Sequence, residues 1–159
     1  MIALVQRVAE ASVDIDGNVE SEIKRGLLIL VGVHKEDSDR EIDWVARKCA
    51  NLRVFPDENG VMNLSLIDVG AEALVVSQFT LYGQVGKGNR PSYNSAAGGD
   101  GARERFDNFV TRLESLLGKT VGTGVFGAMM EVRLVNDGPV TIWVEKAPAS
   151  PGQISSAPS

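Results

Sequence analysis

The segment Leu27-Leu28-Ile29-Leu30-Val31-Gly32-Val33 restricts the fold of this chain more than any other. It is apolar from end to end and follows Gly26, which breaks the pattern before it. A transmembrane helix needs roughly 20 apolar residues, so the segment is far too short to span a bilayer. A short apolar run of this length is typical of a buried β-strand, and we predict one here.

The residues before this segment predict a β-hairpin. Val13 and Ile15 alternate with polar neighbours, which is the pattern of a half-buried strand. Asp16-Gly17 is a strong hairpin signal, because glycine adopts positive φ without a steric penalty. Apolar residues resume at Val19 and Ile23, so we expect a second strand after the turn.

Two amphipathic helices are predicted farther along the chain. Ser38 and Glu41 form a capping-box pattern, with serine at the N-cap and glutamate three residues on. The apolar residues that follow have helical spacing and define one buried face: Ile42, Val45, Ala46, Cys49 and Leu52. A second helix carries Phe106, Phe109, Val110, Leu113, Leu116 and Leu117. Gly118 is suited to end this helix.

The remaining segments predict strands and loops. Residues 73–81 are rich in β-formers and predict a central strand, whereas residues 83–101 predict a long loop. Apolar residues alternate again at 130–134 and 140–144, with Asn136-Asp137-Gly138-Pro139 between them. Strands with two main helices set apart predict an α+β fold in residues 1–147. The proline- and serine-rich tail, 148–159, is expected to be disordered.

Composition excludes several kinds of site. The 159 residues, 43% of them hydrophobic, are ordinary for one soluble domain. Because Cys49 and His34 are the only residues of their kinds, one chain can form neither a disulfide nor a zinc site built on Cys and His. Cys49 is expected to be a core thiol. His34 is either a general base or a polar residue in a strand-to-helix connection.

Charge and targeting patterns limit the partners and the location. The net charge of −5 argues against binding along a nucleic-acid backbone, which depends on Lys and Arg, but a short nucleic-acid end remains compatible. Lys87 and Arg90, in the long loop, are either phosphate contacts or solvated charges. No signal-peptide pattern or membrane-spanning run is present, so we expect a cytoplasmic protein without membrane partners.

Two polar segments do not fit an ordinary core. Ser77-Gln78-Phe79-Thr80-Leu81 places hydroxyl and amide groups on a predicted buried strand, either as its solvent face or as part of a site. Thr80 would need an adjacent base to act as a nucleophile, and none is near it in the sequence. Gly138-Pro139 is either an ordinary turn or, with a cis bond, a rigid pair of carbonyl acceptors lining a pocket.

These two segments, 77–81 and 136–141, resemble the signature segments of D-aminoacyl-tRNA deacylases. Further segments are similar to the family in the same order: 1–8, 60–64, 90–93 and 123–128. The resemblance covers roughly residues 1–146 and leaves out the tail. It implies a hydrolase that edits aminoacyl-tRNA by releasing D-amino acids.

The resemblance also implies an architecture and a set of site residues. It implies a homodimer of barrel-like α+β subunits, with a mixed or antiparallel sheet, that binds the aminoacyl 3′ end of tRNA at its interface. The ester and the terminal adenosine would be held by main-chain N–H groups around Ser77, Gln78, Phe79 and Thr80. Gly138-Pro139, in the cis form, would reach across from the partner subunit, and Arg7 would hold its carbonyls.

The chemistry implied by the resemblance needs no metal or cofactor. The 2′-hydroxyl of the terminal ribose would assist hydrolysis, with Thr80 as the other candidate nucleophile. Fixed carbonyls that clash with an L side chain would spare L-aminoacyl-tRNA, whereas glycyl-tRNA, which has no side chain, would be a further substrate. Two alternatives remain: a non-catalytic module that binds nucleic-acid ends, and an amidase or esterase for free D-amino acid derivatives.

Overall fold

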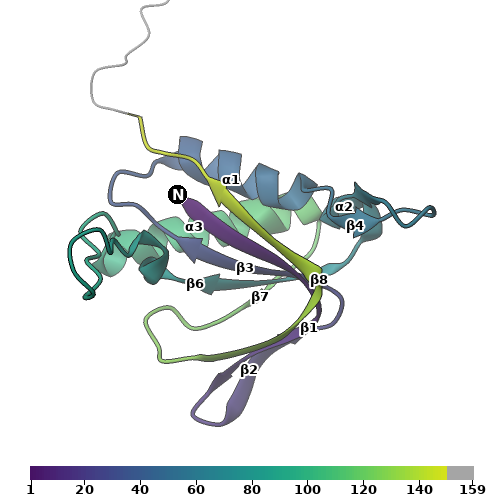
Figure 1. The fold of residues 1–159 in the computed structure, drawn as a ribbon, viewed down its shortest axis with the longest axis horizontal. Helices are drawn as coiled ribbons and strands as arrows, with labels where there is room; N and C mark the ends of the chain where they lie inside the picture. Colours follow the sequence, from purple (N-terminus) through teal and green to yellow (C-terminus); the bar gives the residue numbers. More distant parts are fainter. Residues whose placement is uncertain (150–159) are drawn as a thin grey trace, which may run out of the picture.

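Strand β3 (Gly26–Gly32) lies at the centre of a mixed sheet in the computed structural model, which describes residues 1–149 (Figure 1). Its residues Leu27, Leu28 and Ile29 are fully buried, which confirms the buried strand predicted there. On one side β3 pairs antiparallel with β1 (Ile2–Ile15). On the other side it pairs parallel with β6 (Glu72–Ser77), which pairs parallel with β7 (Gly122–Thr123).

Strand β1 is long and bends between two partners. Its first half pairs with β3, and its second half forms the predicted hairpin with β2 (Asn18–Ile23). The hairpin turn has positive φ at Asp16 (50°) and Gly17 (79°). Strand β8 (Glu131–Glu145) pairs antiparallel with β1 along almost its whole length. The sheet therefore curls into a nearly closed, barrel-like form.

The two predicted helices cover one face of this sheet. Helix α1 (Asp39–Asn51) begins with the predicted capping box at Ser38 and Glu41, and α3 (Gly99–Leu117) ends at Gly118 in the left-handed conformation. Both helices contribute side chains to one core with the facing side of the sheet. This core includes Val5, Leu27, Ile29, Val31, Ile42, Val45, Cys49, Phe106, Phe109 and Leu113.

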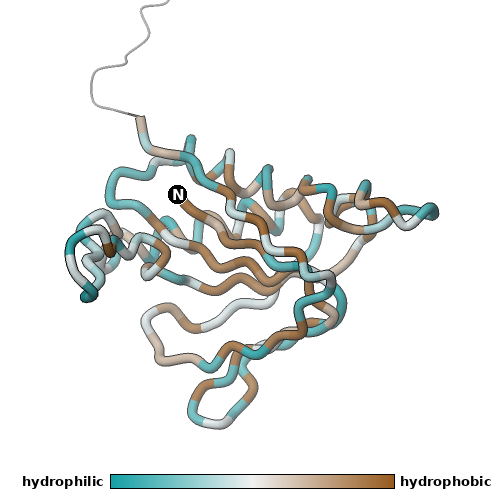
Figure 2. The backbone as a smooth tube through the Cα atoms, viewed as in Figure 1, coloured by the Kyte–Doolittle hydropathy of each residue, from teal (hydrophilic) through white to brown (hydrophobic). Residues whose placement is uncertain are grey.

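A second core fills the inside of the curled sheet. It consists of Val8, Ala11, Val13, Ile23, Leu28, Leu74 and Val76, which come from four strands. Leu28 belongs to this core and its neighbours Leu27 and Ile29 to the first, because successive strand residues point to opposite faces. Figure 2 shows this as hydrophobic colouring along the central strands. Burial on both faces explains why β3 is apolar throughout.

Several details differ from the sequence predictions. The α+β class and the barrel-like sheet are confirmed for a single chain, but a short helix, α2 (Leu66–Val69), and a small hairpin of β4 (Phe55–Pro56) and β5 (Met62–Leu64) were not predicted. The expected loop 83–101 is shorter, because α3 already begins at Gly99. None of the helices in residues 1–149 is long and apolar enough to cross a membrane. The predicted tail lies mostly outside the described residues.

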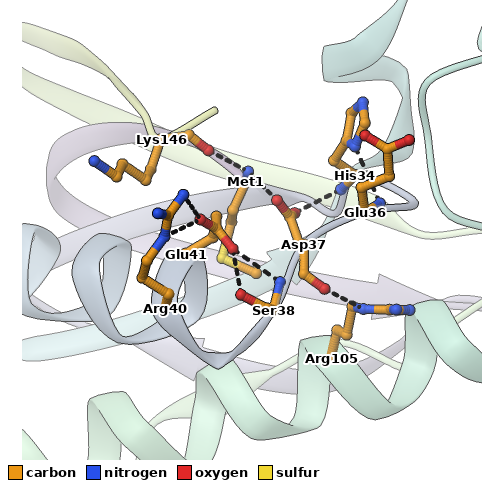
Figure 3. A network of polar contacts seen from close by, with 9 residues as sticks. All are labelled: Met1, His34, Glu36, Asp37, Ser38, Arg40, Glu41, Arg105 and Lys146. Carbon is orange, nitrogen blue, oxygen red and sulfur yellow. Dashed lines mark hydrogen bonds and ion pairs between the residues drawn. The ribbon is translucent and has the colours of Figure 1, made fainter. Parts of the chain in front are cut away.

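A buried ionic network joins the start of β1, the end of β8 and the segment after β3 (Figure 3). The α-ammonium group of Met1 forms an ion pair of 2.6 Å with the Asp37 carboxylate and donates to the Lys146 carbonyl oxygen at 2.7 Å. Both charged groups of this pair are fully buried. Asp37 also accepts from the His34 N–H at 2.7 Å, and its carbonyl accepts from Arg105 at 2.8 Å. The network thus joins β1, α3 and the end of β8 to the connection before α1.

Candidate functional site

The segment 77–81 is not the continuous strand that the sequence predicts. Strand β6 ends at Ser77, and the chain enters a short 3₁₀ helix, η1 (Phe79–Tyr82). Its last ladder bond runs from the Gln78 N–H to the Val31 carbonyl oxygen at 2.7 Å, and β3 itself ends at Gly32. Without a longer partner strand, the backbone satisfies its hydrogen bonds locally, as in the bond from the Leu81 N–H to the Gln78 carbonyl at 3.2 Å.

Two main-chain donors remain available at the start of η1. Within residues 1–149, no acceptor is hydrogen-bonded to the N–H groups of Phe79 and Thr80, as is usual for the first residues of a helix. The Gln78 N–H is not available, because Val31 occupies it. Of the four predicted main-chain donors, the structure therefore presents the neighbouring pair at Phe79 and Thr80 most clearly.

A largely apolar cavity of about 290 Å³ opens beside these donors. Ser77 and Phe79 form one wall, and the other walls come from the end of β3, the start of α3 and the segment before β8. Its further lining residues are Val31, Val33, Ala97, Gly98, Gly99, Ala102, Phe126 and Gly127. Sequence reasoning did not identify these as site residues, because they are distant along the chain. The signal that pointed toward part of them was the family-like segment 123–128.

Within the described residues, the Thr80 hydroxyl has no basic partner. Its oxygen accepts a hydrogen bond from the Gln78 side-chain amide, which cannot take up a proton. His34 lies in the strand-to-helix connection, where its Nδ1 accepts from the Glu36 N–H at 3.1 Å. This arrangement favours the interpretation of His34 as a polar connection residue. Thr80 therefore lacks the adjacent base that an activated hydroxyl needs.

The lone cysteine lies away from this site. Cys49 is fully buried in the helix–sheet core, and burial raises the pKa of its thiol to about 12, which confirms the predicted core thiol. Among residues 1–149, no three His, Cys, Asp or Glu side chains are grouped so that they would hold a metal ion. The polar groups beside the cavity are therefore main-chain donors, hydroxyls and an amide.

The second predicted segment forms a projecting corner within β8. Gln6 on β1 pairs with Thr141 and Val8 pairs with Asn136, so Arg7 alone faces the four residues 137–140. The alternation at 130–134 and 140–144 suggested two strands with an interruption between them, but β8 continues through the bulge as one strand. The bond between Gly138 and Pro139 is cis, and both residues are exposed. We call these two residues the Gly138–Pro139 corner.

Arg7 holds the base of this corner. Its side chain is largely buried, and its Nε donates to the Asp137 carbonyl oxygen at 2.9 Å and lies 3.1 Å from the Asp137 carboxylate. A terminal guanidinium nitrogen donates to the Val54 carbonyl. We expected Arg7 to hold the carbonyls of Gly138 and Pro139, but the contact is to the residue before them. Arg7 thus fixes where the corner starts.

Asn136 fixes where the corner ends, a role that the sequence did not reveal. Its side-chain oxygen accepts from the Val140 N–H at 3.0 Å, and its amide nitrogen donates to the Val140 carbonyl at 3.1 Å. One side chain therefore bridges the bulge as a paired strand residue would. Arg7 and Asn136 together leave the Gly138–Pro139 corner little freedom.

The corner and the 77–80 segment lie at opposite ends of the strands in one chain. The corner lies opposite Arg7 on β1. Arg7 pairs with Leu27, which in turn pairs with Ala73 near the start of β6, four residues before Ser77. At about 3.3 Å per strand residue, the two features are separated by roughly 13 Å along the strands. Figure 1 shows β6 ending on the left and β8 bending sharply on the right.

Comparisons with known proteins agree over most of the chain. A family model described as D-Tyr-tRNA(Tyr) deacylase matches residues 4–145. A D-aminoacyl-tRNA deacylase of Salinibacter ruber is 59% identical over 146 residues, which cover 92% of this chain and 97% of that protein. A protein of the same name from Chromobacterium violaceum is 59% identical over 145 residues, with coverage of 91% and 97%.

Solved structures show the same architecture. One described as c-Myc DNA Unwinding Element Binding Protein has a TM-score of 0.87 at 42% identity and covers 94% of this chain and 100% of that chain. Another, described as a probable eukaryotic D-amino acid tRNA deacylase, has a TM-score of 0.78 at 16% identity, with coverage of 90% and 97%. The second likeness concerns the fold alone.

Proposed function

Because the chain belongs to the D-Tyr-tRNA(Tyr) deacylase family, we propose that it hydrolyses the ester between a D-amino acid and the 3′ end of tRNA and spares L-aminoacyl-tRNA. The observation that carries this proposal is the pair of N–H groups of Phe79 and Thr80, which have no acceptor among residues 1–149 and lie beside an apolar cavity. Such a pair is suited to an ester carbonyl, whose oxygen gains negative charge as water adds.

The adjoining cavity is suited to the terminal adenosine. Its walls are mostly apolar, and Ser77 and Phe79 connect it directly to the two donors. If the nucleoside occupies the cavity, the amino-acid side chain is left outside it. The main-chain donors bind the ester and not the amino-acid side chain, so the enzyme acts on many D-amino acids. Glycyl-tRNA has no side chain to be rejected and is therefore also a substrate.

The proton chemistry comes from the substrate. Thr80 is hydrogen-bonded to an amide and has no base, so its hydroxyl serves as a polar contact rather than as a nucleophile. The 2′-hydroxyl of the terminal ribose is adjacent to the scissile ester and assists the attack of water. Hydrolysis breaks the bond between the acyl carbon and the ribose oxygen, releasing the free D-amino acid and tRNA.

Selection between enantiomers comes from the Gly138–Pro139 corner of a second subunit. Within one chain the corner is roughly 13 Å along the strands from Ser77, too far to contact the same bound aminoacyl group. The corner is exposed, and β8 also exposes Leu134, Val135 and Trp143, which suit a homodimer contact. In such a dimer, the carbonyls of a corner fixed at its two ends by Arg7 and Asn136 clash with an L side chain.

Rejection by a clash suits the task better than a closer fit. A hydrophobic pocket separates similar substrates by only about 1–3 kcal/mol, which is too little to protect abundant L-aminoacyl-tRNA. A fixed backbone obstacle adds repulsion against the wrong enantiomer. We expect the enzyme to act in the cytoplasm, together with its tRNA substrates.

Paired deacylation of D-Tyr-tRNA and L-Tyr-tRNA by the purified protein tests the proposal. We expect rapid release of D-tyrosine and no release of L-tyrosine above the spontaneous rate. Equal rates on the two substrates would contradict the chiral claim. Activity on free D-amino acid esters would instead favour the esterase alternative, because a substrate-supplied 2′-hydroxyl predicts none.

A non-catalytic module that binds nucleic-acid ends is the second candidate. The absence of a base at Thr80 favours it, as does the description of a structural relative as a DNA-element-binding protein. Single-turnover assays with protein in excess separate the two. Binding of D-Tyr-tRNA without any ester cleavage would favour the module.

A further inference from the structure

The loop after η1 is held by an antiparallel bridge between two of its residues. Gln84 and Ser92 pair with each other, with N–H to carbonyl distances of 2.8 and 3.0 Å in the two directions. The segment between them forms an open hollow of about 710 Å³. It is lined by Gln84, Val85, Gly86, Lys87, Ser92 and Asn94. Figure 2 shows this loop as predominantly hydrophilic.

Two aromatic rings in contact lie between the candidate site and the hollow. Phe79, which lines the apolar cavity, is 56% exposed, and its ring meets that of Tyr93 edge to face at 5.0 Å between centroids. Tyr93 lies between Ser92 and Asn94, both of which line the hollow. Phe79 and Tyr93 therefore lie between the cavity and the loop.

The loop also carries positive charge without acidic neighbours in contact. Lys87 and Arg90 are exposed, and within residues 1–149 neither forms an ion pair. The chain as a whole has a net charge of −5. The loop is therefore locally positive on a protein that is negatively charged overall. Aromatic rings beside cations are the features with which proteins bind single-stranded nucleic acid, by base stacking and phosphate contact.

We propose that the segment Gly83–Asn94 binds the unpaired nucleotides that precede the terminal adenosine of tRNA. A base packs on the exposed Phe79 ring and the half-buried Tyr93 ring beside it, and Lys87 and Arg90 contact the phosphates. The inference deepens the proposed function, on which it rests. It also explains how an acidic protein holds RNA, because only a short single-stranded end needs to be bound.

Binding of a short RNA tests the inference directly. The probe is a fluorescently labelled RNA oligonucleotide that ends in CCA, and its Kd is measured by anisotropy at several salt concentrations. For the double variant Lys87→Ala/Arg90→Ala we expect a roughly tenfold weaker Kd. The slope of log Kd against log salt concentration should fall by about 0.7 for each phosphate that is no longer neutralised. The control Lys24→Ala/Arg47→Ala removes the same charge elsewhere and should retain the wild-type Kd and slope.

A second arm separates this inference from the proposed hydrolysis. We compare D-tyrosyl-tRNA with D-tyrosyl-adenosine, which lacks the preceding nucleotides. The double variant should raise KM roughly tenfold for the tRNA with kcat unchanged, and should change KM for the nucleoside ester less than twofold. Equal effects of both double variants on RNA binding, or equal effects on the two substrates, would overturn the inference. If the wild type cleaves neither substrate, the proposed hydrolysis fails, and the oligonucleotide arm still decides the binding site.

Discussion

The Nε of Arg7 donates a hydrogen bond to the main-chain carbonyl oxygen of Asp137 at 2.9 Å. The two residues are 130 positions apart, and the contact fixes the start of a corner that β1 faces with a single residue. Because Arg7 also donates to Val54, the guanidinium joins the corner to the segment after α1. The largely buried Arg7 side chain thereby fixes the position of two exposed residues, Gly138 and Pro139.

Arg7→Lys should loosen the corner while retaining a positive charge. Lysine cannot donate to Asp137 and Val54 in the planar geometry of the guanidinium, so we expect a loss of about 2 kcal/mol in the free energy of unfolding. We also expect the ratio of D-Tyr-tRNA to L-Tyr-tRNA hydrolysis rates to fall at least about tenfold. Urea unfolding and the paired assay measure the two effects. Arg47→Lys, on the exposed face of α1, is the control, and an Arg7→Lys protein with an unchanged ratio would contradict the role of Arg7.

Gly138→Ala should disturb the corner directly. Gly138 has a φ of +151°, and an added Cβ would lie 2.6 Å from the Val140 nitrogen, so the backbone has to shift. We expect the D-to-L rate ratio to fall at least about tenfold, because fixed carbonyls provide the discrimination. Gly60→Ala is a matched control, since Gly60 has a φ of +75° but open space around it. The control should cost about 1 kcal/mol of stability without altering the ratio.

Thr80→Val should leave most of the activity intact. Loss of a true acid–base group lowers the rate by about 10²–10⁴-fold, whereas we expect less than about a tenfold loss here, because Thr80 has no base. The complementary substrate is D-Tyr-tRNA that ends in 2′-deoxyadenosine, whose hydrolysis should fall at least about 100-fold. Rapid cleavage of the deoxy substrate, together with an inactive Thr80→Val enzyme, would show that Thr80 rather than the 2′-hydroxyl assists hydrolysis.

Glu41 should make folding sensitive to acid. Burial opposes ionisation of this carboxylate, but hydrogen bonds from Ser38 and the charge and hydrogen bond of Arg40 outweigh it and lower the pKa from 4.5 to about 2. A lowered folded-state pKa stabilises the protein above pH 4.5, and this contribution is lost as the pH falls toward about 2. The shift corresponds to roughly 3 kcal/mol.

The measurement for this prediction is urea unfolding between pH 2 and 7. The wild type should lose stability relative to Glu41→Gln as the pH falls through the window from 4.5 to about 2. Glu58→Gln, at an exposed position, is the control and should follow the wild type throughout. A constant difference between the wild type and Glu41→Gln across this range would show that the carboxylate contributes no pH-dependent stability.

The predictions from sequence succeeded where one local pattern determines the structure. The apolar run at 27–33 lies within a doubly buried strand, and the Ser38–Glu41 pattern starts α1 as a capping box. They failed where the outcome depends on a distant partner. Residues 73–81 have strand-forming composition throughout, but β6 ends at Ser77 because β3 ends at Gly32.

The site was predictable only in part for the same reason. The polar residues of segment 77–80 and the Gly138–Pro139 corner stand out in the sequence, but the cavity beside segment 77–80 takes its other walls from three distant segments. The bridging role of Asn136 depends on the bulge opposite Arg7, which no local pattern reveals. The separation of the two segments within one chain follows from strand register, which requires the folded sheet.

We propose that the corner of one subunit selects the handedness of the substrate bound to the other subunit. Phe79→Pro removes one donor of the ester site but leaves the corner intact. Proline is acceptable at this position because the preceding Gln78, with φ −143° and ψ 78°, is outside the helical region. This variant should be inactive alone and can supply only its corner to a partner subunit.

The most direct measurement is the D-to-L rate ratio of purified heterodimers, in which one subunit carries Gly138→Ala and the other Phe79→Pro. Sites formed between subunits join an intact 77–80 segment to an intact corner, so the ratio should return to the wild-type value. Heterodimers of Gly138→Ala with the double variant Phe79→Pro/Gly138→Ala should keep the low ratio. A ratio that stays low in the first heterodimer would show that the corner acts within its own chain and would contradict selection by the partner subunit.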